Sequence, residues 1–136
     1  MMATIMGLVG RYTVFPSYHQ VEVRDAASAD CPRWETGQEP VLAGDQCIVL
    51  ATRSDLDGDV ELDVWVGGLE SEPAGPLLFA GELLVTEQGA VVGSSLTEQL
   101  YPIPLPIGWH PVRIDADPPE EPARFTVVFD GAPAAP

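Results

Sequence analysis

The residues of this chain best suited to chemistry form one acidic run near its middle. Five carboxylates fall within nine positions, and they are Asp55, Asp57, Asp59, Glu61 and Asp63. Oxygen ligands at this density suit calcium. An EF-hand loop that began at Asp55 would need glycine at its sixth position and glutamate at its twelfth, whereas this chain has Val60 and Val66 there. The run is therefore not an EF-hand, and a looser calcium site is one alternative to a solvated acidic turn.

The same run also suits the binding of a basic protein. Between Arg53 and Arg113 the sequence has ten acidic residues and no Lys or Arg. A surface of one sign attracts an oppositely charged partner and speeds the encounter. If residues 60–66 form a strand, alternation places Trp65 on the face of Glu61 and Asp63, where it would act as an aromatic anchor. We therefore predict a partner-binding site made of the five carboxylates and Trp65, with plain solubility as the alternative role for the charge.

Catalytic machinery is not recognisable in the sequence. The two histidines, His19 and His110, stand in no Ser, Cys or metal-ligand motif, and the chain contains no Lys. A phosphate-binding glycine loop and a dinucleotide motif are also absent from the sequence. We expect a protein that is not an enzyme and has no cofactor and no catalytic metal. An enzyme would need a deep pocket that gathers one of the histidines with several carboxylates.

The overall charge narrows the range of partners. Asp and Glu number 21 and the basic residues six, all of them Arg, so the formal net charge is -15. Binding to nucleic acid or to anionic lipid depends on Lys and Arg, so we expect neither as a direct partner. The apolar N-terminus lacks the basic region of a signal peptide. We expect a cytoplasmic protein, monomeric or weakly dimeric.

The two cysteines, Cys31 and Cys47, are too few for a disulfide framework or a cysteine-rich metal site. Cys47 begins the apolar run at residues 47–50, so we expect a reduced, small core residue there. Cys31 precedes Pro32 in a loop, and its role is left open.

The elements that must position these residues are short strands. Fourteen prolines and thirteen glycines interrupt the chain, and the apolar residues between them mostly alternate with a period of two. The expected strands are residues 19–24, 47–52, 60–66, 77–85, 90–93, 101–107, 112–116 and 125–129. We predict an all-β fold, a single-domain antiparallel β-sandwich of about seven or eight strands over residues 1–136. Residues 1–11 and 131–136 are expected to be flexible, and residues 28–40 to hold a short helix or a structured loop.

Residues 101–107 alternate three prolines with apolar residues. Proline cannot donate a hydrogen bond to a neighbouring strand, so this strand is expected at the edge of a sheet. We interpret the prolines as protection of that edge against pairing with another molecule, rather than as a ligand site.

Four short motifs make the chain resemble a known family. They are Ser17-Tyr18-His19-Gln20 opening a strand, Trp34 followed by a glycine in the next segment, Val-Thr-Glu-Gln-Gly at 85–89 before a strand and Leu-Pro-Ile-Gly-Trp at 105–109. Over roughly residues 15–130 the sequence resembles the competence protein J family, inhibitors of a DNA-entry nuclease. The resemblance implies a compact β-sandwich without catalytic activity that binds and restrains a nuclease, and a basic nuclease would complement this acidic chain. The proline-rich strand, the acidic run and the Ala/Pro tail depart from the family pattern, and no binding residue is carried over.

Overall fold

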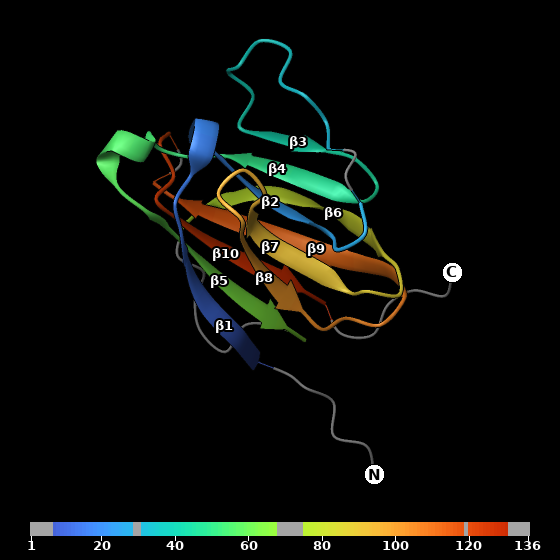
Figure 1. Ribbon diagram of the computed structural model, residues 1–136. Helices are drawn as coiled ribbons and strands as arrows, with labels where there is room; N and C mark the ends of the chain where they lie inside the picture. Colours follow the sequence, from blue (N-terminus) through green and yellow to red (C-terminus); the bar gives the residue numbers. More distant parts are fainter. Residues whose placement is uncertain (1–6, 29–30, 68–74, 119, 131–136) are drawn as a thin grey trace.

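The computed structural model describes residues 7–28, 31–67, 75–118 and 120–130, which form ten strands and two short 3₁₀ turns (Figure 1). In chain order the elements are β1 (Gly7–Val14), η1 (Ser17–His19), β2 (Gln20–Asp25), β3 (Val41–Ala43), β4 (Cys47–Ala51), η2 (Asp55–Asp57), β5 (Val60–Val66), β6 (Leu77–Val85), β7 (Ala90–Ser94), β8 (Gln99–Ile103), β9 (Gly108–Asp117) and β10 (Arg124–Phe129). The strands are short because glycine, proline and Asp-rich segments interrupt the apolar runs.

The strands form two five-stranded sheets. The first has the order β1-β5-β10-β9-β6 and the second the order β3-β4-β2-β7-β8. The prediction of an all-β chain is confirmed. The expected number of strands was too low, and among the described pairs β5 and β10 run parallel while the others run antiparallel. Local alternation cannot show this parallel pair, because the two strands are far apart in the sequence.

The core lies between the two sheets. On β5, Val60, Leu62 and Val64 are fully buried, as the alternation predicts. They join one apolar cluster with side chains of the first sheet such as Phe125 and of the second sheet such as Ile48. Burying a side chain of this size contributes about 1.5–3 kcal/mol. This shared core is what holds the sheets together.

The proline-rich segment lies at a sheet edge, as predicted. Its strand, β8, pairs with β7 and ends the second sheet as far as the chain is described. Pro102 lies within β8, whereas Pro104 and Pro106 follow it, so the strand is shorter than expected.

Two strands were not anticipated. β1 includes residues 7–11, which the sequence analysis assigned to a flexible terminus, and β3 lies at the edge of the second sheet. Both lack clear alternation: β1 has Gly7 and Gly10, and a register shift interrupts its pairing with β5. Residues 31–40 form a loop without a helix, and residues 1–6 and 131–136 lie outside the described part. Within that part, no helix has the length and hydropathy needed to cross a membrane.

Candidate protein-binding site

The acidic run occupies the β4–β5 connection and the first half of β5. Ser54 organises the connection, because its carbonyl accepts a hydrogen bond from the Asp57 amide (3.0 Å) and its hydroxyl accepts one from the Leu56 amide (3.2 Å). Gly58 follows with a φ of 111°, which other residues rarely adopt. The result is a tight turn that exposes Asp57 and Asp59 and leaves Leu56 93% exposed.

Not all of the predicted site residues are accessible. Glu61 is exposed, but Asp63 is only 5% exposed and Trp65 only 9%. The prediction that Asp63 and Trp65 present themselves to a partner is therefore wrong. The side chain of Asp55 is not among those that the structure describes.

Residues on the neighbouring strands flank both side chains. Arg124 on β10 donates a hydrogen bond from Nη2 to Oδ2 of Asp63 (3.0 Å), and Nε of Arg11 on β1 lies 3.7 Å from Oδ1. Trp65 is in register with Leu8 on one side and Val128 on the other. Alternation identifies the face of a side chain, but it does not reveal which distant strands lie beside it.

A second acidic segment joins the first in space. Its exposed carboxylates are Asp117, the last residue of β9, and Glu120 and Glu121 in the β9–β10 connection. The Pro122 carbonyl accepts a hydrogen bond from the Arg53 amide, and the Ala123 carbonyl accepts one from the Glu61 amide, each at 2.9 Å. The two connections therefore lie together, with η1 beside them, in Figure 1. We call the end of the molecule formed by η1 and these two connections the acidic end.

The sequence pattern predicted a site only in the first of these two segments. The signal for the second was its pair of glutamates between prolines in a loop. The parallel pairing of β5 and β10 brings the start of β10 beside the start of β5, and this pairing is not visible in the sequence.

The acidic end also carries exposed apolar side chains. Tyr18 on η1 is 77% exposed, and η1 contacts η2, which carries Leu56. Tyr18 and His19 have φ values of 54° and 57°, in the left-handed region that L-residues avoid. The Thr52 amide donates to the His19 carbonyl (2.8 Å) and ties this strained turn to the end of β4. Exposed apolar side chains among carboxylates are typical of protein interfaces.

A pocket of about 570 Å³ opens beside η1, lined by Tyr18, His19 and residues of the loop before β3 and of both acidic connections. Glu39 in this lining accepts hydrogen bonds from the amides of Thr36 (2.8 Å) and Gly37 (3.1 Å). The bond from the Thr36 amide is the main cause that lowers the pKa of Glu39. His19 lines the pocket together with Glu39, Glu120 and Glu121.

The outer face of the first sheet holds one further carboxyl group of interest. Asp115 on β9 is 1% exposed, and neither of its oxygens has a hydrogen-bond partner among the residues that the structure describes. It forms an ion pair with Arg113, whose Nη2 lies 3.8 Å from Oδ1. Burial raises the pKa of Asp115, and Arg113 offsets part of that effect.

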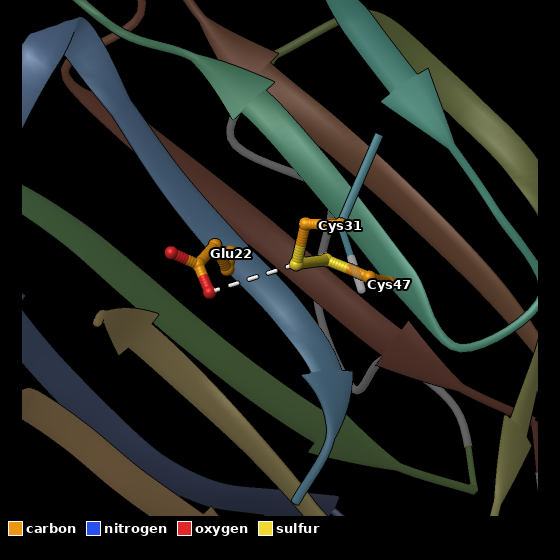
Figure 2. Close-up of side chains that lie close together, drawn as sticks. All are labelled: Glu22, Cys31 and Cys47. Atoms are coloured by element: carbon orange, nitrogen blue, oxygen red, sulfur yellow. Dashed lines mark hydrogen bonds between the residues drawn. A yellow bond between two sulfur atoms is a disulfide. The ribbon is translucent and has the colours of Figure 1, made fainter. Parts of the chain in front are cut away.

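The two cysteines form a disulfide, so the prediction of a reduced Cys47 is wrong (Figure 2). The fold brings their Cα atoms to 5.2 Å, a separation that a disulfide spans easily. Glu22 lies beside the bond, with Oε1 at 3.9 Å from Sγ of Cys31, and its carboxylate also binds Arg24 and Ser95. With the sulfurs bonded to each other, this cluster offers no thiolate to a metal. Disulfides are rare in the reducing cytoplasm, so the bond weighs against the cytoplasmic location, which stays a prediction.

The fold is similar to that of a solved protein. The crystal structure of ComJ, inhibitor of the DNA degrading activity of NucA, from Bacillus subtilis, superimposes with a TM-score of 0.73, covering 94% of this chain and 98% of that one. The sequences are 15% identical, so the likeness concerns the fold. No protein-family model and no curated protein matches the sequence. The resemblance drawn from short motifs is thus confirmed for the three-dimensional fold.

Proposed function

We propose that this protein is a non-catalytic inhibitor that binds a basic nuclease, or a similar basic effector, through its acidic end. The observation that carries the proposal is the shared fold with ComJ over nearly the whole of both chains. ComJ inhibits the DNA-degrading activity of a nuclease, and a shared fold raises the expectation of a shared role without establishing it.

The distribution of charge supports this role. A nuclease must attract DNA, whose phosphates favour a basic surface. This chain has a net charge of -15, and its acidic end gathers exposed carboxylates from two separate connections and from the strand ends that flank them. They are Asp57, Asp59, Glu61, Asp117, Glu120 and Glu121. Such a surface would compete with DNA for the nuclease and speed the encounter between the two proteins.

The exposed apolar residues supply what charge alone lacks. Tight binding needs side chains that lose contact with water when the complex forms. Because Trp65 is buried, Tyr18 and Leu56 take the role of anchors at the acidic end.

The test begins with capture of partners from a lysate of the source cell on the immobilised protein, followed by elution with salt. The eluted fraction is expected to degrade DNA, and addition of the purified inhibitor candidate to that fraction is expected to suppress the degradation. A salt-eluted fraction without nuclease activity, or with activity that an excess of the protein leaves unchanged, would contradict the proposal.

The site is tested with a triple variant, Asp57→Asn, Asp59→Asn and Glu61→Gln. We expect association with the captured nuclease to slow by about tenfold at low ionic strength and to depend less on salt. The matched control removes three exposed carboxylates elsewhere on the chain, by Asp45→Asn, Glu82→Gln and Glu87→Gln. Equal slowing by both variants would show that net charge matters and the acidic end does not.

A second candidate is a ligand-binding module, favoured by the 570 Å³ pocket, a size typical of small-molecule sites. If the ligand is calcium, this second candidate predicts that the melting temperature of the protein rises in millimolar calcium. An unchanged melting temperature would remove calcium as the ligand.

A further inference from the structure

The pocket beside η1 combines two kinds of side chain that a cation would contact. Its lining includes the aromatic residues Tyr18 and Trp34 and the carboxylates Glu39, Glu120 and Glu121. Aromatic faces and carboxylates both attract cations, and together they form a site for a flat, positively charged group.

The cation in the lining does not neutralise this combination. Arg53 also lines the pocket, but its guanidinium donates to the Asp59 carbonyl and lies close to Gly58. It is thus engaged by the β4–β5 turn. The three glutamates outnumber it, and the lining favours a cation over an anion.

The walls of the pocket are held in place before any partner binds. Trp34 donates from Nε1 to Oε1 of Gln20 (2.8 Å) at the start of β2. Glu39 is held by the Thr36 and Gly37 amides. The backbone of η1 beside the pocket is tied to the end of β4 by the hydrogen bond from the Thr52 amide to the His19 carbonyl. A site arranged in advance loses less entropy when a ligand enters.

We propose that this pocket receives an arginine side chain of the basic partner, a role that rests on the proposed inhibitor function. The guanidinium group is planar, stacks on aromatic rings and forms paired hydrogen bonds with carboxylates. The ammonium group of lysine does neither as well. Charge complementarity thus selects a basic partner, and the shape and chemistry of the lining select arginine within it.

The pocket is tested without any nuclease, by nuclear magnetic resonance titration of the intact, oxidised protein. The probe is N-acetyl-arginine methylamide, and the comparison probes are the lysine and citrulline analogues. We expect saturable shifts of the Trp34 indole and Glu39 amide signals with the arginine probe, with binding at least about threefold weaker for the lysine analogue. Shifts scattered over all exposed carboxylates, or equal binding of citrulline, would overturn the pocket.

Four variants sharpen the test. Tyr18→Asn removes the ring while keeping a residue that tolerates a positive φ; Tyr18→Phe keeps the ring. We expect Tyr18→Asn to weaken the arginine probe about two- to fivefold and Tyr18→Phe to change it little. Glu120→Gln with Glu121→Gln should weaken it by a similar factor, whereas Glu82→Gln with Glu87→Gln should not.

The same variants, assayed for nuclease inhibition, separate the two proposals. If both Tyr18→Asn and the double variant Glu120→Gln with Glu121→Gln inhibit the nuclease as strongly as wild type, the pocket is refuted as the partner's arginine site. The inhibitor role would then stay intact. Specific binding of the arginine probe without any inhibition would refute the inhibitor role and leave a guanidinium-binding pocket.

Discussion

Replacing Asp115 with asparagine is expected to stabilise the protein at neutral pH, although most substitutions of buried residues destabilise. Asp115 is 1% exposed and accepts no hydrogen bond within the described part of the chain, where Arg113 is the cation that pairs with it. Its negative charge is therefore buried with little compensation. Asparagine has nearly the same shape and no charge. The substitution removes the cost of the charge while it keeps the packing on β9.

The magnitude follows from two opposing effects. The Arg113 side chain is 49% exposed and lies 3.8 Å away, so water screens the attraction to about 1 kcal/mol. Burial of an ionised carboxylate costs several kcal/mol before such compensation. We expect Asp115→Asn to raise the free energy of unfolding by about 1–2 kcal/mol at pH 7.

The pH dependence of the stability gives the sign of this effect independently. Burial raises the pKa of Asp115 in the folded state above its ordinary value of 3.8. The folded protein therefore loses stability as the pH rises from that value through the raised pKa, because ionisation is harder in the folded than in the unfolded state. The advantage of Asp115→Asn should vanish below pH 3.8 and be complete above the folded-state pKa.

The assay is urea unfolding followed by fluorescence of the tryptophans, at several pH values from 3 to 8. Asp63 on β5 provides the matched control, because it is also buried on the outer face of the first sheet but accepts a hydrogen bond from Arg124 at 3.0 Å. Asp63→Asn should destabilise by about 1–3 kcal/mol at pH 7. The reasoning is refuted if Asp115→Asn destabilises at pH 7, or if its effect is the same at pH 3 and pH 8.

Three further outcomes are expected from stability measurements. Replacing Cys31 and Cys47 together by alanine should lower the free energy of unfolding by about 3 kcal/mol, because the disulfide closes a loop of 16 residues; a loss below about 1 kcal/mol would mean that the bond does not restrict the unfolded chain. Gly93→Ala should cost about 3 kcal/mol or more, since Gly93 has a φ of 135° and a Cβ atom there would collide with the Gln99 carbonyl; a wild-type urea midpoint would contradict this geometry. Trp65→Ala should lower the free energy of unfolding by about 3 kcal/mol because the ring is buried. Tyr18→Asn should leave the free energy of unfolding within about 0.5 kcal/mol of wild type. A larger loss for Tyr18→Asn than for Trp65→Ala would mean that Trp65, and not Tyr18, is the accessible anchor.

Much of the fold was predictable because alternation is a local property. Val60, Leu62 and Val64 are buried as their spacing predicts, and the prolines at 102–106 placed their strand at an edge. β1 and β3 escaped prediction because glycines and a short length hide their periodicity.

The candidate site was predictable only in part. The turn at Asp57 and Asp59 is exposed as expected, because Asp and Gly residues favour such turns. Trp65 was assigned to the correct face and the wrong environment. Its neighbours in the sheet lie on β1 and β10, which come from opposite ends of the chain.

The sequence by itself determined the all-β class, the acidic character and the position of the first acidic turn, because composition and residue-by-residue alternation act over short stretches of chain. Tertiary structure decided which acids remain exposed, which loops meet them and whether the cysteines bond. The Arg124–Asp63 pair, the meeting of the β9–β10 loop with the β4–β5 turn, and the disulfide between Cys31 and Cys47 all join residues distant in sequence. Such contacts depend on the order and direction of strands in the sheets, and local patterns carry no record of that order.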